Sequence, residues 1–258
     1  VGVPKTVSLS LKNTAPADVN FTENLSSTAF SNTTTGFVAS GSVTGIGGGA
    51  SGTGSLLVGI GATLSAGPQS GTTVLGVRSI PLLGSGLEPT ELVPQTIIVS
   101  GTLYDFANPV YTGGTLRFGN LRVGDIATRT LGFTNVAKTN SVYQDVLNVS
   151  ATTDNAKLSV SSFAALPAGI AAGSLTLTAL TSAGGDLAST VSLVLTSTPT
   201  VLGLSSSTLS AGSVVTTSGG VYAFAQPSWS AGSVVFGNVH VGATRSLNLG
   251  NVSISARS

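Results

Sequence analysis

One stretch of the chain occurs twice, and this duplication constrains the fold more than any other feature. The first copy spans Leu103–Gly124, the second spans Val221–Gly242, and every matched pair lies 118 residues apart. Ten of the 22 positions are identical, including one proline and one Phe-Gly-Asn triplet in each copy. A fixed spacing of about the length of one ordinary domain indicates tandem domains. A residue present in both copies is therefore explained first by the shared fold.

The composition favours a β-protein that is sparsely charged. Charged residues make up 7% of the chain, against about 25% in typical globular domains. The net charge of +1 comes from ten basic and nine acidic residues that are scattered without clusters, so we expect neither nucleic acid nor an anionic membrane surface as a partner. No apolar run approaches the ~18 residues of a membrane span. So few charges suit a subunit of a solid assembly better than a free monomer.

Alternating apolar and polar residues predict strands and no helix. Near the N-terminus, Val7, Leu9 and Leu11 alternate with polar residues, which is the pattern of a strand with one buried face. About seven short strands in each repeat indicate tandem immunoglobulin-like β-sandwiches in an all-β protein. The other main strands are expected at Gly36–Val43, Ser55–Ile60, Thr73–Ser79, Thr96–Leu103, Thr130–Phe133, Lys157–Phe163, Ser174–Leu180, Thr190–Thr196 and Ser213–Ala223. The expected core contains Leu9, Leu11, Phe37, Val58, Val77, Phe118, Leu131, Phe133, Leu147, Leu177, Leu193, Leu195 and Phe236.

The repeats place three segments along the chain. Val1–Ala15 matches Val123–Ala137 at an offset of 122 residues, so we expect residues 1–109 to form a sandwich that lacks its first strand. Residues 110–227 are predicted to form a complete sandwich. Residues 228–258 are predicted to be the opening strands of a further repeat, or a strand donated to the next subunit.

The duplicated stretch is predicted to be the junction between domains. Pro109 lacks an N–H and is expected to be the linker, followed by a first strand over Tyr111–Asn120 that ends in a turn at Gly119 and Asn120. Aromatic residues beside the prolines are expected to pack at the interface between domains. The predicted junction residues are Tyr104, Phe106, Pro109, Tyr111, Tyr222, Phe224 and Pro227.

The stretches FGNLRVGDIATRTLGFTN and FGNVHVGATRSLNLGN resemble the opening strands of the abnormal-spindle/Hydin type of immunoglobulin-like domain. The Y-x-F-A-x-P junction is more similar to bacterial secreted proteins called choice-of-anchor D. This resemblance covers essentially the whole chain, most strongly at the junctions. It implies exported surface β-sandwiches with no ascribed chemistry.

The residues show no catalytic or metal-binding constellation. Cysteine is absent, and His240 is the single histidine, so a catalytic triad and thiolate chemistry are not expected. Glu88 and Glu91 are interpreted as a solvated loop. Asp105 and Asp125 lie near a junction where calcium could bind, but alanine replaces both in the other copy. We therefore predict no enzyme activity, no cofactor and no metal.

The function predicted is structural. We expect a bacterial extracellular filament, sheath or surface layer in which Trp229–Val241 of one molecule completes the first domain of the next, as in donor-strand complementation. The assembly residues are Trp229, Val234, Phe236, Val239 and Val241. Ser246–Asn251 duplicates Thr6–Leu11, a redundancy that fits a segment of a longer chain equally well. The alternative function is an adhesin or glycan-binding module in which Tyr111 or Trp229 stacks on a sugar, although packing between domains explains both residues more simply.

Overall fold

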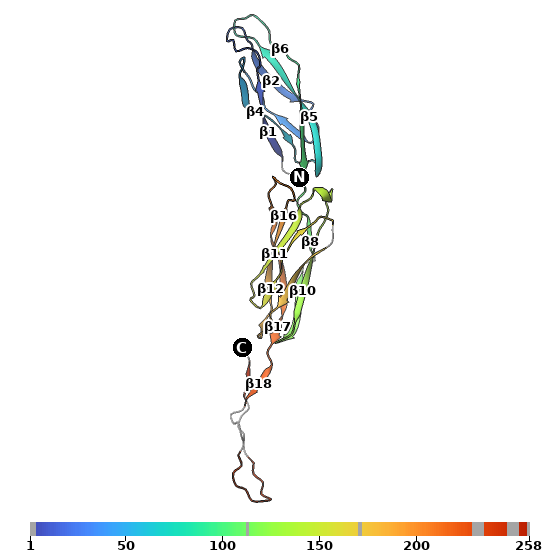
Figure 1. Ribbon diagram of the computed structural model, residues 1–258, viewed down its shortest axis with the longest axis vertical. Coiled ribbons are helices and arrows are strands. Elements are labelled where there is room, and N and C mark those ends of the chain that lie inside the picture. The colour runs from blue at the N-terminus through green and yellow to red at the C-terminus, as the bar shows by residue number, and fades with distance from the viewer. Residues whose placement is uncertain (1–3, 112–113, 170–171, 229–234, 247–252, 257–258) are drawn as a thin grey trace. The chain divides into compact units, whose positions relative to one another are not determined.

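The computed structural model describes residues 4–111, 114–169, 172–228, 235–246 and 253–256. Contacts divide the chain into two units (Figure 1). Unit 1 contains Val1–Phe106 and Ala137–Asp145, and unit 2 contains Ala107–Val136 and Val146–Ser258. The regular elements among the described residues are all strands, apart from the short 3-10 helix η1 at Ser141–Tyr143. No helix among them is long and apolar enough to cross a membrane.

Unit 2 is an immunoglobulin-like sandwich of two sheets, as the sequence predicts. One sheet has the order β12-β14-β10-β8, and the other has the order β13-β11-β16-β17-β15, with β9 beside β17. The strands are β8 (Pro109–Tyr111), β9 (Thr115–Arg122), β10 (Ala127–Asn135), β11 (Val146–Thr153), β12 (Leu158–Val160), β13 (Phe163–Leu166), β14 (Gly173–Ala179), β15 (Gly185–Asp186), β16 (Ser189–Thr198) and β17 (Ser207–Tyr222).

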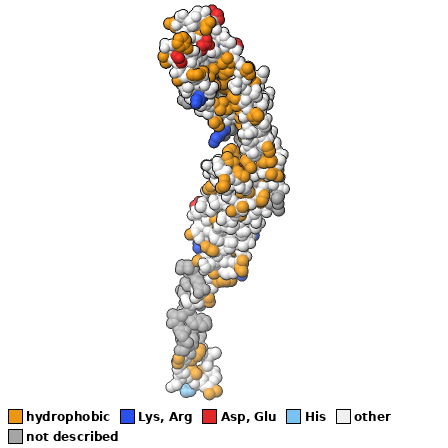
Figure 2. All heavy atoms as spheres, turned by 45° about the horizontal axis from the view of Figure 1, so that its top comes forward, with side chains coloured by type: hydrophobic (Ala, Val, Ile, Leu, Met, Phe, Trp, Pro, Cys, Tyr) orange, Lys and Arg blue, Asp and Glu red, His pale blue; other side chains and the backbone are white. Residues whose placement is uncertain are grey.

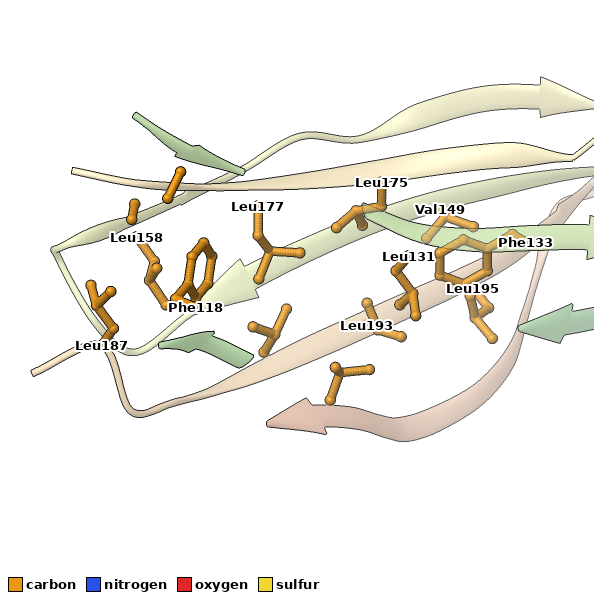
Figure 3. Packing of buried hydrophobic residues seen from close by; sticks show 14 of the residues in the cluster. Phe118, Leu131, Phe133, Val149, Leu158, Leu175, Leu177, Leu187, Leu193 and Leu195 are labelled. Carbon is orange, nitrogen blue, oxygen red and sulfur yellow. The ribbon is translucent and has the colours of Figure 1, made fainter. Parts of the chain in front are cut away.

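The core of unit 2 lies between these sheets. Alternate residues of β10, β14 and β16 point inward, as the period of two requires. Eighteen buried residues join in one cluster, and Figure 3 shows Phe118, Leu158 and Leu177 grouped at one end and Phe133, Val149 and Leu195 at the other.

Unit 1 has the same plan with fewer strands. Its sheets have the orders β1-β4-β3 and β2-β5-β6, with β7 paired to β5. The strands are β1 (Lys5–Lys12), β2 (Asn24–Ser31), β3 (Phe37–Ser40), β4 (Ser51–Ile60), β5 (Gly67–Ile80), β6 (Thr90–Glu91) and β7 (Gln95–Leu103). Among the side chains that the structure describes, the buried cluster of this unit contains Leu56, Leu75 and Val77, against eighteen residues in the cluster of unit 2.

The predicted core residues are mostly buried, and the partly buried ones lie in unit 1. Nine of them are buried: Val58, Val77, Phe118, Leu131, Phe133, Leu147, Leu177, Leu193 and Leu195. Leu9, Leu11 and Phe37 in unit 1 are only partly buried. The prediction for Phe236 is wrong, because its side chain is 44% exposed.

The structure corrects two details of the predicted junction. Pro109 is not a linker but the first residue of β8, where it lies opposite Asn135 of β10. Gly119 and Asn120 do not end the strand, because β9 continues to Arg122 and the chain turns at Val123 and Gly124.

Unit 1 also includes a segment from the middle of the second repeat, Ala137–Asp145. Backbone hydrogen bonds join Asp105 N to Tyr143 O (2.8 Å) and Asp145 N to Asp105 O (2.9 Å). The rings of Tyr104 and Tyr143 meet edge to face, with centroids 5.7 Å apart. The repeat pattern did not predict this docking.

Candidate assembly site

The first strand of unit 2 is divided between both sheets. Its first part, β8, pairs antiparallel with β10. Its second part, β9, pairs parallel with β17, from Thr115 opposite Thr216 to Arg122 opposite Tyr222. One segment therefore closes an edge of each sheet.

The Phe-Gly pair of β9 forms a bulge. The partners of Ser218 and Gly219 are Arg117 and Gly119, so Phe118 is an extra residue on the β9 side. Bulges re-aim side chains, and Phe118 points inward and is 3% exposed. Gly119 has a φ of 75°, a conformation that favours glycine. The repeated Phe-Gly dipeptide thus serves to insert the phenylalanine.

The bulge fits closely against β17 and is held by an arginine. A Cβ on Gly219 would lie 2.5 Å from the carbonyl oxygen of Gly119, so the strand passes at a distance that only glycine allows. Arg129 donates from Nε to Arg117 O (2.6 Å) and from Nη2 to Phe118 O (3.4 Å). Its guanidinium carbon also lies 5.5 Å from the centre of the Phe118 ring.

Unit 1 presents the same strand edge without a partner strand among the described residues. Strand β7 corresponds to β17 at the offset of 118 residues and pairs only with β5. Val215, Thr217 and Val221 of β17 are buried, whereas their counterparts in β7 are only partly buried. These counterparts are Ile97, Val99 and Leu103. We call the outer edge of β7 the acceptor edge.

The second copy of the β9 sequence lies in the C-terminal tail, mostly exposed. Phe236 corresponds to Phe118 but is 44% exposed, and Val239 and Val241 are 51% and 107% exposed. Of the predicted assembly residues, Trp229 and Val234 lie outside the described residues. Strand β18 (Ala225–Ser228) pairs with β19 (Ser253–Ala256).

The described tail already has the local geometry of the corresponding part of unit 2. Gly237 and Gly242 have φ values of 66° and 85°, against 75° and 94° for Gly119 and Gly124. Arg245 Nη1 donates to Phe236 O (3.2 Å), as Arg129 does to Phe118 O. Residues 235–246 are not in a strand, but they repeat the glycine conformations and the arginine contact of the bulge and turn in unit 2.

The predicted junction residues divide between the two units, with Tyr104 and Phe106 in unit 1 and the others in unit 2. Tyr104 packs on Tyr143 in unit 1, while Tyr111 packs in the core of unit 2, 5.3 Å from Phe133 between ring centroids. Phe106, Tyr222 and Phe224 are 38%, 58% and 57% exposed. Arg122 lies over the Phe224 ring at 5.5 Å. Pro227 is exposed in β18.

The candidate chemical residues lie apart. His240 is exposed in the tail, and Glu91 pairs with Arg78 at the surface while Glu88 is exposed. Asp105 is buried and accepts from Thr139 Oγ1 (2.7 Å), whereas Asp125 is exposed and accepts from Arg122 N (2.7 Å). No group of three or more possible metal ligands occurs among the described residues. Charged side chains are sparse on the face that Figure 2 shows.

One carboxyl group outside the site has a shifted pKa. The hydroxyl of Ser189 and the N–H of Thr190 donate to Asp154 and lower the pKa of that carboxyl below its usual value. These bonds fasten the loop before β12 to the start of β16.

Comparison with known proteins gives only distant likenesses. No protein-family model and no curated protein matches the sequence, so the resemblance to choice-of-anchor D and Hydin-type proteins stays a prediction. A Porphyromonas gingivalis protein of unknown function is 12% identical over 85% of this chain and 91% of its own, with a TM-score of 0.27. Zebrafish RET cadherin-like domains 1 to 4 are 16% identical, with 77% and 42% coverage and a TM-score of 0.27.

A third solved structure is CfaE, the adhesive subunit of the CFA/I fimbria of enterotoxigenic Escherichia coli. It is 13% identical over 84% of this chain and 86% of its own, with a TM-score of 0.27. The assignment of this chain as tandem immunoglobulin-like sandwiches rests on its own sheets.

Proposed function

We propose that this chain is a structural subunit of a bacterial extracellular filament, sheath or surface layer, and that its subunits join head to tail by strand complementation. In this arrangement, Trp229–Val241 of one copy lies along the acceptor edge of unit 1 in the next copy. The observation that carries the proposal is the contrast between two identical residues, because Phe118 is 3% exposed and Phe236 is 44% exposed.

The correspondence between the units gives the register. Because Gly219 lies opposite Gly119 and Val221 opposite Leu121, Gly101 would lie opposite Gly237, and Leu103 opposite Val239. A Cβ on Gly101 would meet only the end of the Ile60 side chain, at 2.9 Å. The glycine that β9 needs in β17 is therefore repeated in β7, where no described backbone atom of another strand lies within 4 Å of the added Cβ.

The expected strength is sufficient for a specific contact. Burial of Val234, Phe236 and Val239 contributes on the order of 5–8 kcal/mol before ordering costs. The positive φ values of Gly237 and Gly242 and the turn at Val241 and Gly242 are already present in the tail, which reduces those costs. A head-to-tail contact of this kind does not close on itself and so propagates into a linear polymer.

A disulfide test examines this register directly. The chain contains no cysteine, so no native thiol competes with an introduced pair. In unit 2, Gly220 lies opposite Asn120, and the corresponding pair is Thr102 and Asn238. Neighbouring strands bring Cα atoms within the 4.4–6.8 Å that a disulfide needs.

We expect chains carrying Thr102→Cys, mixed with chains carrying Asn238→Cys, to form a heterodimer on a non-reducing gel. The control replaces Asn238→Cys by Val235→Cys, which the bulge would place opposite Ser100, two residues and therefore about 7 Å out of register. Equal cross-linking by both pairs, or none by either, contradicts the proposed register.

A second test examines polymer formation. The native protein should form regular fibres or lattices in electron microscopy, and Phe236→Asp should abolish them. Leu202→Asp, at a loop position that is 102% exposed, should leave them unchanged. Normal polymers from the Phe236→Asp protein would refute strand donation.

A further inference from the structure

Unit 1 contains a cavity that the strand-donation proposal does not use. It has a volume of about 400 Å³, and its lining includes Asn13, Phe21, Glu23, Leu25 and Ser79. Its place in the fold is the end of β1, whereas Gly101 of the acceptor edge lies near Ile60, which is opposite Lys5 at the start of β1.

The corresponding place in unit 2 is filled by the chain segment that leads into β8. Ala107 N donates to Ser197 Oγ (2.9 Å), and Asn108 N donates to Asn135 Oδ1 (2.8 Å). Val136 N donates back to Asn108 O (2.9 Å). Ala107 is 4% exposed, so its methyl group is enclosed where these bonds form.

The cavity in unit 1 is lined by the same two hydrogen-bonding side chains, an asparagine and a serine. Asn13 corresponds to Asn135, and its Nδ2 donates to Ile46 O (3.0 Å) as that of Asn135 donates to Leu166 O (3.1 Å). Ser79 corresponds to Ser197, because Ser79 lies opposite Leu25 of β2 as Ser197 lies opposite Leu147 of β11. The Ser79 hydroxyl donates to Glu23 Oε2, which leaves its oxygen lone pairs able to accept from a backbone N–H.

An exposed aromatic residue at the cavity points to the same kind of occupant. Phe21 is 88% exposed and corresponds to Tyr143 at the offset of 122 residues. Tyr143 packs edge to face on Tyr104, which precedes Ala107 by three residues. The equivalent of Tyr104 in the second copy of the repeat is Tyr222, which is 58% exposed.

We infer that this cavity binds residues Tyr222–Pro227 of a second copy of the chain. Ala225 enters the cavity with its N–H on Ser79, Gln226 N donates to Asn13 Oδ1, and Phe21 packs on Tyr222. Ala225, Gln226 and Pro227 are all exposed within one chain. This site deepens the proposed function and rests on it, since the same tail then continues to the acceptor edge.

The inference extends the donated segment to both sheets of unit 1. In unit 2, Pro109 lies opposite Asn135, and Tyr111 lies opposite Phe133. By correspondence, Pro227 lies opposite Asn13, and Trp229 opposite Leu11, before the strand crosses to β7. The four-residue pairing of β18 with β19 has to open first, and isolated two-stranded pairings are marginally stable.

The test compares two alanine-to-glutamate variants within the tail of the full chain. Ala225→Glu places a charged side chain where the cavity encloses a methyl group, and it should weaken self-association at least tenfold in sedimentation velocity. Ala243→Glu is the matched control, because the corresponding residue in unit 2 is the exposed Asp125. On the acceptor side, Phe21→Ala should also weaken association, whereas Leu83→Ala at a 106% exposed position should not.

The outcomes separate this site from strand donation itself. If Ala225→Glu and Phe21→Ala leave association unchanged while Phe236→Asp abolishes it, the cavity is not a receptor and strand donation stands. If the native protein shows neither association nor the Thr102→Cys to Asn238→Cys cross-link, strand donation fails, and this site fails with it. Loss of association in Ala225→Glu and Phe21→Ala, with both controls unchanged, supports the site.

Discussion

Phe118 and Phe236 occupy the same position in two copies of one sequence, so truncating each of them separates the effect of burial from that of local sequence. Phe118→Ala removes a ring that is 3% exposed. An aromatic side chain buries about 150–250 Å², which at about 25 cal/mol per Å² is worth roughly 4–6 kcal/mol. The truncated residue still buries its methyl group, so we expect unit 2 to lose about 3–5 kcal/mol of unfolding free energy.

Phe236→Ala should behave differently in dilute solution. The ring is 44% exposed and belongs to no buried cluster among the described residues. We expect the unfolding free energy of the monomer to change by less than about 0.5 kcal/mol, as is usual for surface substitutions. Self-association should nevertheless be lost, because the same ring is the main side chain of the proposed donated strand.

The assay is urea unfolding followed by circular dichroism at a protein concentration at which the native chain is monomeric. Phe118→Ala should shift the midpoint of the unit 2 transition without a large change in its slope. Equal destabilisation of the dilute monomer by both substitutions would refute the reasoning, since Phe236 would then already be buried within its own chain. A loss below about 1 kcal/mol for Phe118→Ala would refute the assigned burial.

Three further predictions concern unit 2. Gly219→Ala should destabilise it by at least about 2 kcal/mol in urea unfolding, because the added Cβ would lie 2.5 Å from a carbonyl oxygen of β9. Asn135→Ala should lower the unfolding free energy by about 2–4 kcal/mol in the same assay, because the Asn108 N–H, which donates to Asn135 Oδ1, would lose its acceptor. A neutral result would contradict this role. Ser189→Ala should raise the pKa of Asp154 toward its usual value in an NMR titration. In the native protein, the stabilisation from this carboxylate should be present above the unfolded-state pKa and be lost as pH falls through the lowered folded-state pKa.

Alternation along the chain was sufficient to predict most strands and the class of fold. The strands over Leu9, Val58, Leu131 and Leu193 follow from apolar residues at every second position, which is a local signal. The division of the first strand into β8 and β9 has no such signal, because it depends on which sheet each half meets. The bulge at Gly119 resembles a turn in sequence, since glycine with positive φ serves in both.

The candidate site depended on comparison between copies more than on residue type. Phe118 and Phe236 are both followed by Gly-Asn, and the presence of a partner strand decides which of them is buried. Asn13 and Ser79, the polar side chains of the cavity, give no signal by residue type, because asparagine and serine are common along the chain. The role proposed for them follows from Asn135 and Ser197, which accept hydrogen bonds from the Asn108 and Ala107 backbone.

The docking of Ala137–Asp145 in unit 1 means that the unit of duplication and the unit of folding are different. The second sequence repeat contributes a short loop to the compact unit that the first repeat forms. A gene that gains or loses whole repeats keeps this docking intact, because the repeat that contributes the loop follows the repeat whose unit receives it. A gene fragment cut at Phe106 instead encodes a unit without nine of its own residues. Modules of this kind can therefore be shuffled as sequence repeats, but not as the bodies that they form in space.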